Sequence, residues 1–324
     1  MTQNKTIGGF FELELPNKGS LYHDRALALA NGRVCFKVLL DRVKPTKVYL
    51  PFYCCDSIIL PLLEAQIPFE YYAINTAFDP VGIPLLGDSE LFVYINYFGL
   101  KTQTSRKLSK LLGQQLVVDN THAFFEESYG ISWAFNSVRK FFGVPDGGFL
   151  YSPQYLEDNY TPNAHIITEH LWLRLFDRQE DANEFYHQSE AAQTLELKGM
   201  SNLTKQILYS VKFLDVARAR KKYFKILDRV LRPLNQLPAN VFNLMQDAVP
   251  FCYPFLCHKP IHKKLFDEQR IFIPSLWNDV LKRDTEGYAF EKKMAQNILA
   301  LPIDHRLDDH DLQRIIELVL KLAS

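Results

Sequence analysis

Residues 116–151 read LVVDNTHAFFEESYGISWAFNSVRKFFGVPDGGFLY. The stretch opens on an apolar run that is typical of a buried strand and that ends on the carboxylate of Asp119. His122 follows within a few residues. The second half holds Ser137-Val-Arg-Lys140 and then Gly147-Gly148, which leads into another apolar strand. Two buried strands with polar groups between them predict a site at the edge of a sheet.

Apolar runs of strand length recur along the first half of the chain and alternate with helical patterns. This alternation predicts an α/β fold with a mainly parallel central sheet flanked by helices. In such sheets ligands bind outside the carboxyl ends of the strands, where Asp119 is expected. The expected strands are Phe10–Leu15, Lys47–Pro51, Phe69–Ile74, Leu91–Asn96, Gln115–Val118 and Gly147–Tyr151, and the expected helices are Asp24–Leu40, interrupted at Asn31-Gly32-Arg33, and Ser57–Ala65.

The pattern changes after Tyr151. Tyr160–Met200 looks irregular, Asn202–Leu231 predicts a long helix, Asp247–Ile273 predicts short strands, and Asp308–Leu322 has an apolar helical stripe. We therefore expect a large domain over residues 1–210, which holds the strand-end site, and a small C-terminal α+β domain over residues 211–324.

The composition argues against several classes of protein. Of the 324 residues 47% are hydrophobic and 23% are charged, and 37 Lys and Arg balance 37 Asp and Glu. Zero net charge gives no broad electrostatic reason to bind nucleic acid or an anionic membrane. Met1–Gly8 lacks the apolar segment of a signal peptide, and no apolar stretch reaches the roughly 20 residues that span a bilayer. The five cysteines lack metal-site spacing and are read as reduced thiols, so we expect a cytoplasmic protein.

The residues of the 116–151 stretch suit pyridoxal 5′-phosphate as a cofactor. This cofactor needs a lysine for its aldehyde, a carboxylate that keeps its pyridine nitrogen protonated, and hydroxyl or backbone N–H groups for its phosphate. Lys140, Asp119 and Ser137 can supply these parts, and Ser137 lies one helical turn before Lys140. Gly147-Gly148 would let the chain reverse tightly beside the cofactor.

Each of these residues also has an ordinary structural interpretation. A lone lysine is most often exposed on the surface, and an aspartate after a strand is most often a turn or cap residue. Ser137-x-x-Lys140 is also the pattern of a serine acylase. The cofactor interpretation therefore depends on the ordered set.

The block from Asp119 to Gly148 resembles the core of the DegT/DnrJ/EryC1/StrS family of sugar aminotransferases. That family has an Asp-x-x-His or Asp-x-x-Gln element at a strand end, a serine-containing segment with the Schiff-base lysine, and a Gly-Gly turn. Three other stretches are similar to the family in the right order, namely Asn31-Gly32-Arg33, Leu50-Pro51-Phe52-Tyr53 and Leu301-Pro302-Ile303-Asp304-His305-Arg306. The resemblance implies the type I fold of pyridoxal-phosphate enzymes.

The resemblance also implies a role for each matched residue. Lys140 would form the Schiff base and, once released, act as the proton-transferring base. Asp119 would pair with the pyridinium nitrogen, and His122 would contact the ring or its 3-oxygen. Ser137, Gly32 and Arg33 would bind the phosphate. Tyr53 would stack on the ring. For His122 and Tyr53 the alternative is a packed core residue, and for Ser137 and Gly32 it is a helix cap or an ordinary turn.

The chain departs from the family pattern at several positions. Asn31 and Arg33 replace the serine and threonine of the phosphate turn, and Ser137 lies three residues before the lysine rather than five. The Gly-Tyr-Asn-Tyr-Arg element that crosses the dimer interface in the family is not evident, with Asn202 as a possible substitute. Arg306 is a further candidate, for a donor carboxylate.

By resemblance the expected enzyme is a transaminase. An amino acid such as glutamate would supply the amino group to a keto sugar, expected to be nucleotide-linked, in polysaccharide or related sugar biosynthesis. The expected assembly is a homodimer with sites at the interface. Three alternatives stay open: a pyridoxal-phosphate-dependent lyase or dehydratase, a non-catalytic relative that binds the cofactor, and the serine acylase. In the related sugar dehydratases a histidine replaces the lysine, so Lys140 argues against the first.

Overall fold

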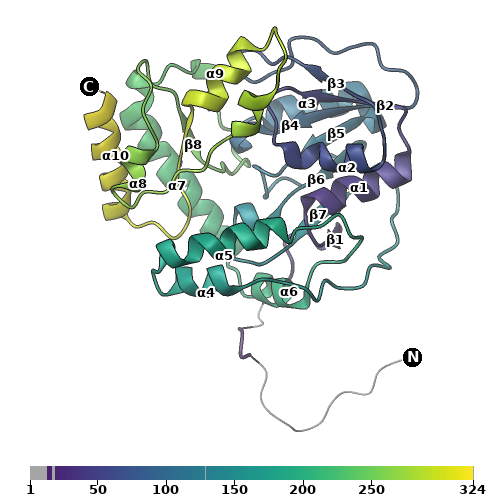
Figure 1. Ribbon diagram of the computed structural model, residues 1–324, viewed down its shortest axis with the longest axis horizontal. Coiled ribbons are helices and arrows are strands. Elements are labelled where there is room, and N and C mark those ends of the chain that lie inside the picture. Colours follow the sequence, from purple (N-terminus) through teal and green to yellow (C-terminus); the bar gives the residue numbers. More distant parts are fainter. Residues whose placement is uncertain (1–12, 17–18, 128, 324) are drawn as a thin grey trace.

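The centre of the protein is a seven-stranded sheet, seen in a computed structural model that describes residues 13–16, 19–127 and 129–323 (Figure 1). The strand order is β1-β7-β6-β5-β4-β2-β3. Neighbouring strands from β6 to β3 run parallel, whereas β7 is antiparallel to both β6 and β1. The expected α/β fold with a mainly parallel sheet is confirmed. The strands are β1 Leu27–Leu29, β2 Lys47–Pro51, β3 Phe69–Tyr72, β4 Glu90–Ile95, β5 Leu116–Asp119, β6 Trp133–Phe135 and β7 Gly148–Tyr151.

The central strands are apolar because they are buried on both faces. All four residues of β5 are buried, as are five of the six residues of β4. A parallel strand covered on both sides has no solvent face to carry polar residues, so its sequence is a continuous apolar run. Asp119 is the polar exception, and it stands at the carboxyl end of β5.

Helix α1, Gly32–Val43, follows β1 directly and packs beside α2, Leu60–Glu64, over one face of the sheet (Figure 1). Asn31 caps α1, since its side-chain oxygen accepts a hydrogen bond from the N–H of Val34 at 2.9 Å. The buried stripe of α1 runs from Val34 to Leu40. Helix α3, Thr102–Leu112, precedes β5.

The rest of the chain forms helices and a small antiparallel sheet. In Figure 1, α7, α8 and α10 lie on the side opposite β2 and β3. Buried residues such as Phe224 and Tyr253 belong to the same apolar core cluster as Leu50 of the large sheet. Because this core is continuous, the division at residue 210 stays a prediction. The elements are α4 Glu169–Leu175, α5 Gln179–Ala191, α6 Asn202–Tyr209, α7 Phe213–Leu231, β8 Tyr253–Phe255, α8 Lys264–Asp267, α9 Ala289–Asn297, β9 Leu299–Leu301 and α10 Asp309–Ala323.

Some expected elements are wrong. The expected helix Asp24–Leu40 contains strand β1 at Leu27–Leu29, because pairing with β7 overrides the local helical pattern. The long helix at Asn202–Leu231 is broken between α6 and α7, and the irregular Tyr160–Met200 segment contains α4 and α5. Of the strand expected at Phe10–Leu15, residues 13–15 are not in a strand and residues 10–12 lie outside the described part.

Within the described ranges, no helix has the length and apolar character needed to cross a bilayer.

Gly148 is required where β7 passes the start of α1. A Cβ atom on Gly148 would lie 2.8 Å from the backbone carbon of Asn31 and 2.9 Å from the carbonyl oxygen of Asn136. We expect Gly148→Ala to lower the free energy of unfolding by about 1–3 kcal/mol, as overpacking does. Denaturant unfolding measures this, and Gly143→Ala, whose Cβ meets nothing within 4 Å, is the matched control. Equal stability of the two variants would contradict the prediction.

Candidate active site

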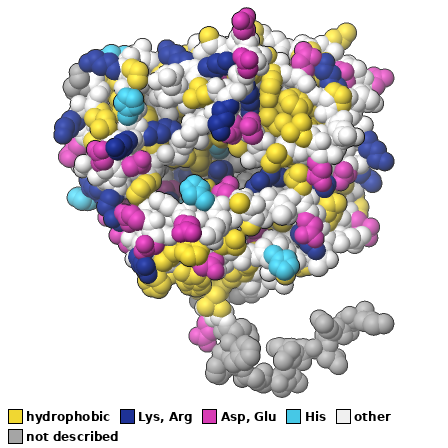
Figure 2. Space-filling view, viewed as in Figure 1, with side chains coloured by type: hydrophobic (Ala, Val, Ile, Leu, Met, Phe, Trp, Pro, Cys, Tyr) yellow, Lys and Arg dark blue, Asp and Glu magenta, His cyan; other side chains and the backbone are white. Residues whose placement is uncertain are grey.

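All the expected site residues except Tyr53, which follows β2, come from three segments at the carboxyl edge of the sheet. Asp119 ends β5, Lys140 ends the short 3-10 helix Val138–Lys140 that follows β6, and Gly32 begins α1. A Cβ atom on Gly32 would lie 3.4 Å from the carbonyl oxygen of Asn136, so the start of α1 lies against the segment that leads to Lys140. Figure 2 shows a hollow near the centre of the viewed side of the molecule, with basic and acidic side chains around it.

The Lys140 side chain is exposed and makes no hydrogen bond or ion pair with a described residue. Its ammonium group is near enough to Asp119 and His122 to lower the pKa of both. An amine that is not held by a carboxylate is available for covalent chemistry.

Asp119 is a buried carboxylate, 9% exposed, without an ion pair among the described residues. One oxygen accepts a hydrogen bond from the N–H of Thr121 at 2.8 Å. Burial raises the pKa of Asp119 to about 6, against the opposing effects of Thr121 and Lys140. A buried carboxylate with a raised pKa is stabilised by a cation that enters beside it. The protonated nitrogen of a pyridine ring is such a cation.

His122 lies deeper than expected for a residue that touches a ligand. It is 1% exposed, and its ring stacks on Phe251 and Trp277 with centroid separations of 4.5 and 5.4 Å. Burial, with a further effect of Lys140, lowers the pKa of His122 to about 3. The imidazole is therefore neutral at physiological pH, and its contact with a cofactor ring stays a prediction.

Tyr53 is fully buried. Its hydroxyl donates to the carbonyl oxygen of Leu276, and its ring packs against Tyr97 and Trp277 with centroid separations of 5.7 and 5.1 Å. A side chain that stacks on a ligand is exposed when the ligand is absent, so this environment favours the alternative of a packed core aromatic. Its stacking on a cofactor would require the segment around Trp277 to move.

The start of α1 offers positive charge to an anion. The first backbone N–H groups of a helix lack intrahelical partners and form its positive end, and here, with Val34 capped by Asn31, they belong to Gly32 and Arg33. Arg33 is half-buried at this end. Ser137 is half-buried at the start of the 3-10 helix, and its side chain makes no capping hydrogen bond. Ser137 is therefore not used as a cap, which leaves its hydroxyl for a ligand.

Asp146 clamps the Gly147-Gly148 turn. Its buried carboxylate accepts hydrogen bonds from the N–H of Ser201 at 3.0 Å, the Ser201 hydroxyl at 2.7 Å and the amide of Asn163 at 3.2 Å. The N–H of Gly147, at φ 114°, donates to the carbonyl of Ala30. The turn after Lys140 is thus tied to α6 on one side and to the residue before the α1 cap on the other.

Two other candidates lie apart from these contacts. Arg306 is exposed and engaged with Asp304 through hydrogen bonds of 2.7 and 3.0 Å. Asn202 is exposed at the start of α6. A donor-binding role for Arg306 and an interface role for Asn202 stay predictions.

Sequence reasoning missed the part of the site that comes from α4 and α5. Arg139, which has no role in the sequence-based interpretation, forms an ion pair of 2.6 Å with Glu190 of α5. His170 of α4 lies near both charges. The hydrophobic stripe of α5 is weak, since Ala182 and Ser189 are its buried residues. The sequence therefore carried little signal for this helix and none for its position.

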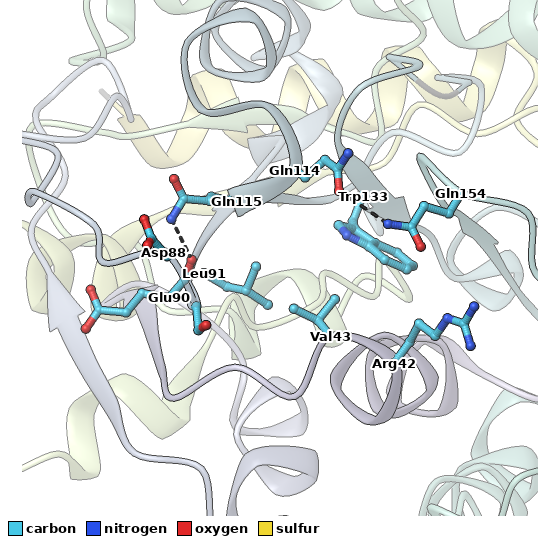
Figure 3. Close-up of a pocket in the computed structure, with 10 residues that line it drawn as sticks. Arg42, Val43, Asp88, Glu90, Leu91, Gln114, Gln115, Trp133 and Gln154 are labelled. Atoms are coloured by element: carbon cyan, nitrogen blue, oxygen red, sulfur yellow. Dashed lines mark hydrogen bonds between the residues drawn. The ribbon is translucent and has the colours of Figure 1, made fainter.

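A separate pocket of about 260 Å³ lies at the opposite, amino edge of the sheet (Figure 3). It opens where β4 begins at Glu90 and β6 begins at Trp133. Gln115 and Gln154 extend over it, and Arg42 borders it from α1. None of the expected site residues lines this pocket.

No protein-family model and no curated protein sequence matches the chain. Solved structures do match its fold. A DegT DnrJ EryC1 StrS aminotransferase from Brucella abortus is 13% identical over 92% of this chain and 86% of that chain, with a TM-score of 0.60. NtdA from Bacillus subtilis with bound cofactor PMP is 14% identical over 92% and 73%, with a TM-score of 0.63. DesI in the presence of its TDP-sugar product is 12% identical over 93% and 83%, with a TM-score of 0.64.

At this level of identity the likeness concerns the fold. The chain has the α/β fold of these aminotransferases along nearly its whole length. The expected type I fold is thereby confirmed.

Asp119→Asn should stabilise the cofactor-free protein at pH 8. The pKa of Asp119 is raised from 3.8 to about 6 by burial. A carboxyl group whose pKa is higher in the folded protein than in the unfolded chain stabilises the fold when it is protonated. This stabilisation is complete below the pKa of the unfolded chain and is lost as pH rises through the pKa of the folded protein. Above pH 6 the ionised carboxylate therefore costs at most about 3 kcal/mol, which the variant avoids.

Urea unfolding at pH 8 and pH 4 measures this effect, with the exposed Asp88→Asn as control. We expect a gain for Asp119→Asn at pH 8 that shrinks at pH 4. A variant that is no more stable than the wild type at pH 8 would refute this account of Asp119.

Proposed function

We propose that the protein is a pyridoxal-phosphate-dependent aminotransferase that acts on a keto sugar. The observation that carries the proposal is the unpaired amine of Lys140 beside the buried carboxylate of Asp119, at the sheet edge where α1 presents its positive end. The fold likeness to aminotransferases, one of them with bound PMP, supports it.

The residues present fit the cofactor at each of its reactive or charged parts. Lys140 supplies the amine for the aldehyde, Asp119 the anion for the ring nitrogen, and the start of α1 the positive charge for the phosphate. When bound, pyridoxal phosphate supplies an electrophilic carbon and an electron-accepting ring.

The protein side chains then have distinct tasks. Lys140 Nζ would be the amine that holds the cofactor and, when free, the base that moves a proton at the substrate carbon. The Asp119 carboxylate would keep a proton on the ring nitrogen. His122 is neutral and enclosed by aromatic rings, so it does not titrate near pH 7. Its task would be to position the cofactor ring and to exclude water.

The finer assignment concerns the substrates. We infer an amino acid donor, glutamate in the first instance, and a nucleotide-linked keto sugar as acceptor, for the synthesis of polysaccharide or related sugars. The support is the family resemblance of the 119–148 block and the TDP-sugar product in the structure of DesI.

Replacing Lys140 by Ala should abolish the visible absorption band of the cofactor-bound protein, because the covalent link is lost. The control is Lys110→Ala, an exposed lysine of α3 that should keep the band. In the wild type we expect glutamate to shift the band and keto sugars to restore it.

The outcomes separate the possibilities. No band in the wild type with added cofactor, or an unchanged band in Lys140→Ala, would refute the cofactor assignment. A normal band that no amino acid shifts would refute transamination and favour a cofactor-binding relative without this activity.

We also propose that the protein is a homodimer that covers the exposed Lys140 side. The apolar side chains at the end of α4 support this. Trp172, Leu175 and Phe176, the last of which follows the helix, are 48%, 69% and 70% exposed. Such clustered apolar side chains mark interaction surfaces. We expect Leu175→Asp combined with Phe176→Asp to shift the sedimentation equilibrium to monomer, whereas Leu85→Asp, 98% exposed elsewhere, should not. A wild type that is monomeric across a dilution series would exclude the dimer.

A further inference from the structure

Three cationic side chains gather at the start of α1. Arg33 belongs to the first turn of α1, and Arg139 and Lys140 end the 3-10 helix beside it. Arg139 is nearly buried, at 12% exposure of its side chain, and its position is set from α5. One nitrogen lies 2.6 Å from a carboxylate oxygen of Glu190, and another donates to the hydroxyl of Ser189 at 3.2 Å.

The segment at the end of α5 is anchored around this point. The side chain of Asn31 donates to the carbonyl of Thr194 at 3.2 Å, in addition to capping α1. Gln193 donates to the carbonyl of Pro145 at 3.3 Å, just before the Gly147-Gly148 turn. The segment therefore touches both the start of α1 and the turn after Lys140, and it holds Glu190 between them.

The charges in this cluster do not balance. Burial acts to raise the pKa of Glu190, but Arg139, Lys140 and Arg33 together outweigh it and lower that pKa. Burial also lowers the pKa of Arg33, and the charge of Arg139 acts in the same direction. Lys140 lies near Asp119 as well and is assigned to the cofactor aldehyde, so the charges left at this point are Arg33 and Arg139 against Glu190, with one net positive charge. A phosphate ester carries about two negative charges at neutral pH.

His170 adds an unpaired polar atom on the same side. The residue is 6% exposed, and its Nδ1 is buried without a hydrogen-bond partner among the described residues. Its ring packs edge-on against Tyr186 of α5, with centroids 5.9 Å apart, and it lies near Arg139 and Glu190. Buried polar atoms are normally hydrogen-bonded, so this nitrogen indicates a missing ligand or bound water.

We infer that Arg33 and Arg139 bind the phosphate group of the cofactor, and that Glu190 of α5 holds Arg139 in position for it. The inference rests on the proposed function. The Asn31 side chain already forms hydrogen bonds with Val34 and Thr194. A phosphate that binds at this turn would therefore meet backbone N–H groups and guanidinium groups. Guanidinium suits the task, because its fork of donors matches phosphate oxygens.

The test compares pyridoxal phosphate with pyridoxal, which lacks the phosphate. Cofactor-free protein is titrated with each compound. The readout is the dissociation constant of pyridoxal divided by that of pyridoxal phosphate, which measures the preference for the phosphate. We expect Arg33→Met and Arg139→Met each to reduce this ratio roughly ten- to a hundredfold, as lost charge-assisted hydrogen bonds do, with pyridoxal binding unchanged. Arg178→Met, an exposed arginine paired with Asp181, should keep the ratio.

A second variant guards against loss of folding. Arg139→Lys keeps the charge and loses the fork, so its ratio should lie between those of the wild type and Arg139→Met. Inorganic phosphate should raise the melting temperature of the cofactor-free wild type and have no such effect on Arg139→Met.

Each outcome has one meaning. A wild type that binds neither compound covalently overturns the proposed function. A wild type that prefers pyridoxal phosphate, with Arg33→Met and Arg139→Met keeping that preference, overturns the present inference alone. If the preference is kept while binding of a nucleoside diphosphate to the cofactor-loaded Arg139→Met falls, the two arginines serve the substrate phosphate instead, and the assignment to the cofactor is refuted.

Discussion

The close approach of the Gly147-Gly148 turn to the start of α1 is the contact on which the rest of the site depends. Gly147 donates its N–H to the carbonyl of Ala30, and Gly148 has no room for a Cβ atom against Asn31 and Asn136. This contact brings the positive end of α1 beside the segment that carries Lys140. Asp146 completes it by anchoring α6 to the same turn. Without this approach, the amine and the helix end would belong to separate surfaces.

Burial gives the site its electrostatic character. Asp119 is held in the protein interior at a raised pKa, whereas the cations Arg33, Arg139 and Lys140 outnumber Glu190 on the other side. These residues therefore favour a ligand with a cationic end toward β5 and an anionic end toward α1. Pyridoxal phosphate has this polarity, with its pyridinium at one end and its phosphate at the other.

Much of the fold was predictable because burial on both faces produces apolar runs in the sequence. Strand β2 has the expected bounds, Lys47–Pro51, and β4 and β5 agree within a residue or two. Strands β1 and β6 were not predicted, since three residues are too few to show a period and their pairing with β7 is a tertiary contact. Among the candidate site residues, Asp119 and Lys140 follow from their order in the chain, whereas Tyr53 follows from the resemblance of Leu50-Pro51-Phe52-Tyr53 and lies in the core.

By itself the sequence determined the α/β class, the polar residues at the strand ends and the order of the 119–148 block, because these depend on residue type and local spacing. Only the tertiary structure decided that Arg139 meets Glu190 and that His122 is enclosed by Phe251 and Trp277. Those contacts join segments that are far apart in the chain, and their geometry follows from how α5 and the C-terminal part pack on the sheet. Local pattern carries no record of such packing, so the surroundings of Lys140 are defined by the fold.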